Sequence, residues 1–359
     1  MPYSIQRYTP ELRGQVLELQ RLLWTSRDDL NERYFRWKYE QNPYLAGPLA
    51  FLAIADGRVV GMRGVHGAPW IVGAAGLPLR VACTGDNIIH PDHRGRGLFP
   101  RMGELMRAEL QKIDRDYLLS TSTNRAMRPL YLHEGWRTMP FIRPLARERA
   151  PGLVAEVTQR ARTRWRRVFP RKVDPFAVLD RRRPADSALS VSDEPRPAEM
   201  AALAAGLARQ DAIRAAKDAT FFSWRFTNPL SRYRFAYHQS GDLLDGYVVL
   251  QTHVEGHDTG VNVVDWEAAT PQALEALLRH VGPRCDGEPL SVWPDGAASP
   301  LDAVWRAAGF RPIADPPVQW VLPALMIRPI RADAAWSVDG VDLIDLQRWS
   351  LRMVASDFY

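Results

Sequence analysis

Residues 90–102 read HPDHRGRGLFPRM, and two glycines alternate with two arginines inside this stretch. An apolar run over 77–90 ends just before the glycines, and apolar residues at helical spacing follow over 99–113. The sequence therefore predicts a strand, a short loop over 92–98 and a helix.

This loop has the composition of an anion site. Gly95 and Gly97 allow a positive φ and a close approach of the backbone to a ligand. The free N–H groups and the dipole at the start of the next helix attract anions. Arg94, Arg96 and Arg101 add charge suited to phosphate oxygens. The pattern predicts a pyrophosphate site held mostly by backbone; the alternative is a glycine-rich surface turn with its arginines in water.

The loop differs from the two commoner phosphate loops. It lacks the Lys-Ser/Thr pair of a Walker motif and the three glycines of a dinucleotide fingerprint. The loop is therefore neither a Walker loop nor a dinucleotide-binding loop.

Composition sets the broad class. The chain has 359 residues, 46% hydrophobic and 25% charged, which is typical of a globular protein of two domains. No apolar run of about 18 residues and no secretory signal pattern occur. Cys83 and Cys285 are too few for a disulfide framework. We therefore expect a cytoplasmic protein, and the eight histidines show no spacing that predicts a metal site.

Positive charge is concentrated in one segment. Residues 159–183 hold ten Lys or Arg against two Asp, although the whole chain has a net charge of only +6. Two interpretations remain open: a patch that contacts an anionic membrane surface or nucleic acid, or a solvated connector. No helix-turn-helix or zinc signature predicts sequence-specific nucleic-acid binding.

The chain repeats itself. Three short patterns recur in the same order: YFRWKYEQNPY (34–44) and FFSWRFTNPLSRY (221–233), ADGRVVG (55–61) and SGDLLDG (240–246), YLHEGW (131–136) and WRAAGF (305–310). Strands that alternate with helices predict an α/β (α+β) fold with a mixed central sheet flanked by helices, in two tandem copies. The expected parts are a first domain (1–148), a basic linker (149–189), a second domain (190–325) and a C-terminal extension (326–359).

The loop occurs in the first copy alone, because the second runs from GVNVVDW (260–266) into EAATPQALEALL (267–278) without a glycine-arginine loop. At the loop the sequence resembles the GNAT superfamily of acyl-CoA-dependent transferases, whose signature is Arg/Gln-x-x-Gly-x-Gly/Ala. Phe99 departs from the small residue of the last position. The resemblance implies two tandem GNAT-like domains, the second degenerate, with acetyl-CoA or another acyl-CoA as co-substrate. The residues that it implies for the cofactor are Arg94, Gly95, Arg96, Gly97, Leu98 and Phe99 for the pyrophosphate, and Asn87, Ile88 and Ile89 as a strand edge for pantetheine.

A second element, STNRAMRPLYLHEGWR (122–137), is similar to the family's segment that follows the next strand. The resemblance implies Asn124 beside the cofactor arm and Tyr131 as the acid for the departing thiolate. A phenol of pKa ~10 can protonate a thiolate of pKa ~8.5. The alternative for Tyr131 is an ordinary helix-face aromatic. Its match in the second copy, Trp305, has no such proton.

The residue that removes the proton of an attacking amine is left open. Asp86, at the end of the strand, is the first candidate, and the alternative is a strand-end Asp that caps a turn or pairs with an arginine. His133 and Glu134 are weaker candidates. The terminal carboxylate of Tyr359, with Asp357, is another, against a tail that merely docks on the core.

We expect an N-acyltransferase, most simply an acetyltransferase, in which a small polar amine such as an amino sugar attacks the thioester directly. Trp37, Tyr39 and Tyr44 either stack on this acceptor or pack, and their recurrence in the second copy favours packing. The alternatives are a Fem-like aminoacyltransferase and a non-catalytic acyl-CoA-binding or interaction protein. A tRNA donor has no use for a pyrophosphate loop, which disfavours the first alternative.

Overall fold

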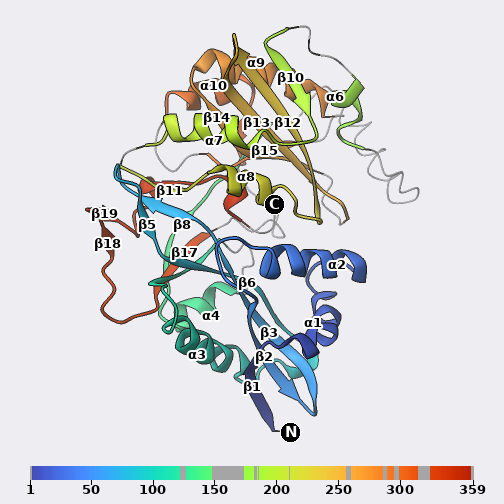
Figure 1. Cartoon of the computed structure of the whole chain (residues 1–359), viewed down its shortest axis with the longest axis vertical. Coiled ribbons are helices and arrows are strands. Elements are labelled where there is room, and N and C mark those ends of the chain that lie inside the picture. Colours follow the sequence, from blue (N-terminus) through green and yellow to red (C-terminus); the bar gives the residue numbers. More distant parts are fainter. Residues whose placement is uncertain are drawn as a thin grey trace.

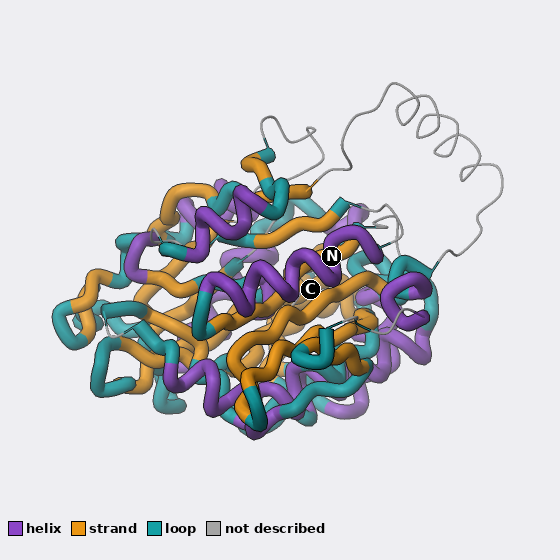
Figure 2. The backbone as a smooth tube through the Cα atoms, turned by 90° about the horizontal axis from the view of Figure 1, so that it is seen from above, coloured by secondary structure: helices purple, strands orange, loops and turns teal. Residues whose placement is uncertain are grey.

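The computed structural model describes residues 2–121, 127–147, 174–181, 184, 186–209, 211–255, 260–285, 289–294, 299–313 and 324–356. Two seven-stranded sheets dominate this part of the chain, and the elements of the two copies form its two ends (Figure 1). Seen from above, helices lie on both sides of the strands (Figure 2). The expected mixed α/β architecture is confirmed. No helix of the described segments is long and apolar enough to cross a bilayer.

The first sheet has the order β1-β2-β3-β6-β7-β17-β8. Its strands are β1 (Tyr3–Arg7), β2 (Leu49–Ala55), β3 (Arg58–Gly67), β6 (Val81–Ile89), β7 (Tyr117–Ser120), β8 (Arg137–Phe141) and β17 (Ala324–Pro329). The helical elements are α1 (Arg13–Gln20), α2 (Asp28–Phe35), the π-helical turn η2 (Arg36–Glu40), the short 3-10 turn η3 (Pro91–His93), α3 (Leu98–Leu110) and α4 (Met127–His133).

Strand alternation divides the core of this copy into two layers. Ala50 and Leu52 of β2 pack in the cluster that includes residues of α1, α2 and η2, whereas Phe51 and Ala53 pack with α3 and α4. Successive side chains of a strand point to opposite faces, so β2 can bury both of its faces only with helices on each side.

The second sheet has the order β10-β12-β13-β14-β15-β9-β16. Its strands are β9 (Leu145–Arg147), β10 (Leu189–Ser192), β12 (Ser231–Ser240), β13 (Leu243–His253), β14 (Val261–Ala268), β15 (Leu290–Val292) and β16 (Arg311–Pro312). Its helices are α6 (Ala177–Arg181), α7 (Pro197–Gly206), α8 (Ala219–Arg225), α9 (Pro271–Val281) and α10 (Leu301–Ala307).

The repeated patterns adopt the same local structure in both copies. In each, an aromatic residue lies in the last turn of a helix, and its carbonyl accepts from the amide five residues later. The Trp136 amide donates to the Tyr131 carbonyl at 3.1 Å, and the Phe310 amide donates to the Trp305 carbonyl at 3.0 Å. The intervening glycine has a φ of 83° at position 135 and 90° at position 309. Only glycine adopts this backbone readily, which explains why the pattern requires it.

The two copies exchange one strand each. β9 follows the first copy in sequence but pairs with β15 and β16 of the second sheet. β17 follows the second copy but lies between β7 and β8 of the first sheet. The sheets therefore do not follow the expected domain boundaries at 148 and 325. β9, which precedes residue 148, belongs to the second sheet, and β17, which spans residue 325, belongs to the first.

A third sheet joins the copies. Its order is β20-β11-β4-β5, with strands β4 (Trp70–Val72), β5 (Leu77–Leu79), β11 (Ile213–Ala215) and β20 (Trp349–Ser350). β11 of the second copy pairs with β4 of the first and with β20 near the C-terminus. The segment expected as an extension (326–359) thus contributes to the first and third sheets, and it also forms a two-stranded sheet of its own from β18 (Ser337–Val338) and β19 (Val341–Asp342). One hydrophobic cluster also contains residues from both copies.

Candidate active site

The candidate site lies where two parallel strands of the first sheet separate. β6 pairs with β7 only from Val81 to Cys83, opposite Tyr117 to Leu119, and β6 then continues to Ile89. Within the described residues, no strand pairs with this edge of β6 beyond Cys83. Asn87, Ile88 and Ile89 lie on this edge of β6, and the Ile89 carbonyl accepts a hydrogen bond from Arg94 Nε at 3.1 Å.

A β-bulge in this segment of β6 changes the face of the sheet to which the side chains beyond it point. Gly64 pairs with Gly85 and Met62 with Ile88, so Asp86 and Asn87 together face Arg63. Asp86 has a φ of 48°. An extra residue in one strand reverses the alternation of side chains beyond it, and bulges often lie beside active sites for this reason.

The loop after β6 presents unpaired amides. Gly95 and Gly97 have φ values of 72° and 67°, and α3 begins directly afterwards at Leu98. Residues 94–97 are exposed, and no group in the described chain accepts a hydrogen bond from the amides of residues 95–99. A Cβ atom added at either glycine would meet nothing within 4 Å. The loop is thus an open cradle of N–H groups at a helix N-terminus, which suits an anion.

The predicted arginines surround this cradle. Arg94 donates to the Ile89 carbonyl at 3.1 Å, and Arg101 donates to the Tyr3 carbonyl at 2.8 Å. Arg94, Arg96 and Arg101 are exposed, and none pairs with a carboxylate of the described residues. Their charge is therefore available to a bound anion.

The side chains of Leu98 and Phe99 serve the core rather than the ligand, with only 1% and 6% exposed. Arg63, fully buried on β3, holds this first turn of α3. Its Nη1 donates to the Phe99 carbonyl at 3.1 Å and to Glu134 at 2.7 Å, and its guanidinium lies 3.7 Å from the Phe99 ring centroid. A large residue at position 99 therefore anchors the loop. Sequence reasoning missed Arg63, although a charge within the apolar run 58–67 was the available signal.

Tyr131 lies in the gap where β6 and β7 diverge. Its hydroxyl accepts from Asn87 Nδ2 at 2.9 Å and shares a hydrogen bond with Thr84 Oγ1 at 3.0 Å. Burial raises the pKa of this phenol, and the charge of Arg63 is the strongest effect that opposes the rise. Tyr131 therefore keeps its proton at neutral pH. Of the predicted site residues, the structure brings Tyr131 and Asn87 into contact.

Asp86 points to the other face of β6, into a buried network of α1, η2 and the segment between the helices. One carboxylate oxygen accepts from Lys38 at 2.9 Å and Trp24 at 3.1 Å. The other accepts from Gln20 at 2.9 Å and Tyr39 at 2.8 Å. This arrangement argues against the predicted general base, because a base needs a lone pair that faces the substrate. Asp86 is ion-paired, as in the alternative interpretation, but its partner is Lys38 and not an arginine.

The remaining base candidates differ in their surroundings. Glu134 is occupied by Arg63, and its carboxylate also lies 4.0 Å from Arg328. His133 is exposed at the end of α4. Asn124, Asp357 and Tyr359 lie outside the described residues, as does most of the basic segment 159–183. No cluster of three metal-binding side chains occurs in the described ranges.

The second copy differs at each of these points. Thr270 caps α9, since its hydroxyl accepts from the Ala273 amide at 3.1 Å. The amide of Ala269 donates to the backbone carbonyl of Asp245 at 2.8 Å. Trp305 replaces Tyr131 and packs against Trp266 and Phe310. The protein itself satisfies amides that an anion would need, which agrees with the prediction that this copy is degenerate.

A comparison with protein-family models finds a match in part of the chain. A model described as an acetyltransferase (GNAT) domain matches residues 198–284, in the second copy. A search of curated protein sequences found no match.

Solved structures cover both copies at low sequence identity. A probable N-acyltransferase from Enterococcus faecalis V583 has a TM-score of 0.60 and 12% identity, over 92% of this chain and 73% of that one. A tandem GNAT protein from the clavulanic acid biosynthesis pathway has a TM-score of 0.55 and 15% identity, over 93% and 100%. Eis1 from Mycobacterium abscessus has a TM-score of 0.51 and 14% identity, over 92% and 74%. The chain therefore shares the fold of these structures, including one tandem GNAT protein, and the GNAT domain model matches part of its second copy.

Proposed function

We propose that the first copy is an acyl-CoA-dependent N-acyltransferase, most simply an acetyltransferase. The observation that carries this proposal is the loop 94–99: in the described part of the chain, the amides of residues 95–99 have no acceptor and its arginines have no carboxylate partner, and a helix starts directly behind it. A diphosphate needs such a cradle. The names of the similar structures, which include a probable N-acyltransferase, support the same chemistry.

The residues of the first copy fit an acyl-CoA. The cradle 94–99 would hold the diphosphate, and the unpaired edge of β6 at Asn87–Ile89 would pair with the amides of the pantetheine arm. When bound, an acyl-CoA supplies an activated thioester carbonyl. Asn87 Oδ1 is buried without a hydrogen-bond partner among the described residues, which leaves one polar atom beside this edge for a ligand.

Tyr131 is our proposed proton donor. Transfer of the acyl group forms an N–C bond and breaks a C–S bond, so one proton must reach sulfur and one must leave nitrogen. The Tyr131 phenol is protonated, lies between the diverging strands and is held by Thr84 and Asn87. These properties support its role as the acid.

The base remains a proposal outside the described residues. Arg225 holds the tail, since its side chain donates to the carbonyls of Val354 at 2.9 Å and Ser356 at 2.8 Å. The same tail residues line a small cavity with Trp37 and His66 of the first copy. The tail therefore reaches the first copy, which supports the terminal carboxylate of Tyr359 as base. For the acceptor we propose a small polar amine such as an amino sugar.

A thermal-shift experiment tests the proposal. Acetyl-CoA at millimolar concentration should raise the Tm of the wild type through binding to the native state. Gly97→Trp should abolish this shift, because the indole would occupy the cradle. Gly241→Trp is the matched control: Gly241 also has a positive φ, 62°, and open space around it, but lies in the β12–β13 turn. Absence of a shift in the wild type with any acyl-CoA would refute the proposal. If the shift is observed, an assay with labelled acetyl-CoA and a panel of amino sugars would identify the acceptor.

A further inference from the structure

A cavity of about 620 Å³ lies in the second copy, at the junction with the first. It opens where β14 leaves β15: the two strands pair only from Val261 to Val263, opposite Leu290 to Val292, and β14 continues to Ala268. The end of β14, α7, residues 214–219 and the start of α10 form the walls, together with Ile71 of β4. The volume lies in the range of small-molecule sites, about 300–1,000 Å³.

Small apolar side chains form one wall. Eight alanines line the cavity: Ala201, Ala204, Ala205, Ala208, Ala215, Ala216, Ala219 and Ala268. Larger side chains at these positions would fill the space. This wall therefore suits the apolar body of a ligand.

Most of the charged residues that line the cavity already have partners. Lys217 Nζ lies 2.5 Å from Asp265 Oδ1 and 2.8 Å from Glu267 Oε1. Asp218 caps α8 by accepting from the Phe221 amide at 2.7 Å. The carboxylates named here outnumber Lys217, and Arg352, which also lines the cavity, adds a positive charge beside them.

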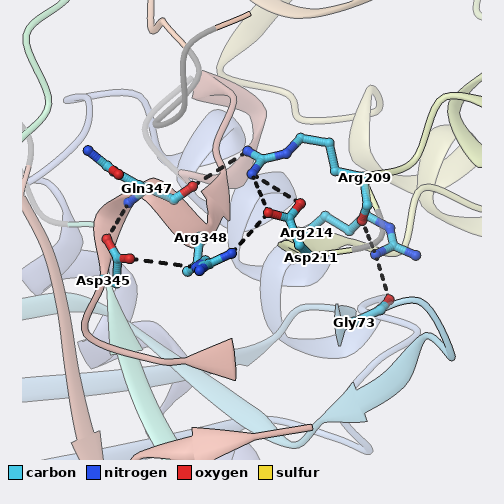
Figure 3. A network of polar contacts seen from close by, with 7 residues as sticks. All are labelled: Gly73, Arg209, Asp211, Arg214, Asp345, Gln347 and Arg348. Carbon is cyan, nitrogen blue, oxygen red and sulfur yellow. Dashed lines mark hydrogen bonds and ion pairs between the residues drawn. The ribbon is translucent and has the colours of Figure 1, made fainter. Parts of the chain in front are cut away.

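Arg214 is different. Its Nη1 donates to the carbonyls of Gly73 and Arg209, both at 3.0 Å, as Figure 3 shows. Within the described residues no carboxylate pairs with it, whereas the neighbouring Arg209 pairs with Asp211. Burial lowers the pKa of Arg214, a sign that its charge is partly desolvated. A partly buried guanidinium without a counter-ion, on the wall of a cavity, is a recognition element for a carboxylate.

The tail fixes this arginine in place. Asp211 also pairs with Arg348 at 3.0 Å, and Arg348 lies 3.6 Å from Asp345 (Figure 3). Asp211 is thereby held by the tail, and Arg214 by the carbonyl of Gly73 in the β4–β5 turn. The cavity is thus preformed rather than dependent on a loop closing over it.

We propose that this cavity binds a small organic carboxylate, with its carboxyl group on Arg214 and its apolar body against the alanine wall. The site lies in the copy that lacks the glycine-arginine loop, so it is independent of the acyl-CoA site.

Calorimetric titration with 2-naphthoate tests this inference, and neutral 2-naphthol is the matched probe without the charge. The wild type should bind 2-naphthoate with one saturable site and bind 2-naphthol at least about tenfold more weakly, because a charged hydrogen-bonded pair contributes about that much. Arg214→Gln should weaken naphthoate binding about tenfold or more, and Arg214→Lys should weaken it less.

A second variant keeps the test decisive if Arg214→Gln does not fold. Ala204→Phe should abolish naphthoate binding by filling the cavity, whereas Ala202→Phe, an exposed position on the same helix, should leave it unchanged. Arg279→Gln, on exposed α9 surface, controls for lost positive charge. Three results would overturn the inference: no saturable binding of naphthoate, equal binding of naphthol, or undiminished binding to Ala204→Phe.

Discussion

The indole rings of Trp37 and Trp224 stack across the boundary between the two copies, with 5.0 Å between centroids and 10° between planes. Each indole N–H donates to the backbone carbonyl of the other residue, both at 3.0 Å. The two tryptophans occupy equivalent positions of the repeated aromatic pattern. Such a reciprocal contact is the signature of a two-fold relationship, in which one surface meets its own copy. The packing interpretation of Trp37 is therefore confirmed.

Removal of either indole should destabilise the protein strongly. Trp37→Ala and Trp224→Ala should each lower the free energy of unfolding by about 3–5 kcal/mol. The double variant should lose less than the sum, because both changes remove the same contact. Chemical denaturation measures all three, with Leu243→Ala, which is 75% exposed, as the control. Strict additivity would contradict the reciprocal contact.

Tyr131→Phe should lower kcat about 100-fold and leave KM for acetyl-CoA nearly unchanged, because it removes a proton donor and no binding group. Tyr8→Phe is the control, since the Tyr8 hydroxyl is buried without a partner in the described chain. Because burial raises the pKa of Tyr131, loss of its proton should not limit the rate until the pH exceeds about 10. Unchanged kcat in Tyr131→Phe would remove the acid role.

Lys38 and Asp86 should behave as a structural pair. Lys38→Met or Asp86→Asn alone should cost about 3–5 kcal/mol, because each leaves a buried charge without its partner. The double variant should recover part of this loss. Arg279→Gln breaks an exposed pair with Glu275 and should cost less than about 0.5 kcal/mol. If Asp86→Asn keeps full stability and abolishes turnover, Asp86 is the base after all.

The buried thiol of Cys285 should make the stability of the protein depend on pH in the alkaline range. Burial raises the pKa of its thiol to about 12, opposed by the charge of Arg147, whereas an unfolded thiol has a pKa of about 8.5. Above about pH 8.5 the unfolded chain loses this proton and the native protein keeps it, so stability falls as the pH rises towards 12. At about pH 9.5 the loss should reach about 1.4 kcal/mol. Cys285→Ala should reduce the slope between pH 8.5 and 9.5; an identical slope would contradict this origin.

The exchanged strands predict that neither copy folds alone. A chain cut at residue 160 gives a first part without β17 and a second part without β9. Each part expressed alone should aggregate or remain unfolded, because the missing strand leaves unpaired sheet edges. Co-expressed parts should form a 1:1 complex, measured by size-exclusion chromatography. Cooperative unfolding of residues 1–160 alone would contradict the prediction.

The parts of this fold that local chemistry determines were predictable. Asp56-Gly57 makes the β2–β3 turn, with φ values of 48° and 75°, because both positions need a left-handed backbone. The anion loop and the repeat were also visible in short patterns. The partners of β9 and β17 were not, because a strand of three to six residues contains no information about which distant edge it joins. The orientation of Asp86 was missed for a related reason: it follows from a bulge, which is set by pairing with β3.

The exchange of β9 and β17 has a consequence for the history of the gene. Because each unit completes its sheet with a strand from the other, deletion of either unit would expose the interior of the other, so both units are retained for stability whether or not both carry out chemistry. A unit that carries out no chemistry is released from the demands of catalysis while its shape is preserved. A pocket inside such a unit can then change its ligand specificity without affecting the reaction in the other unit.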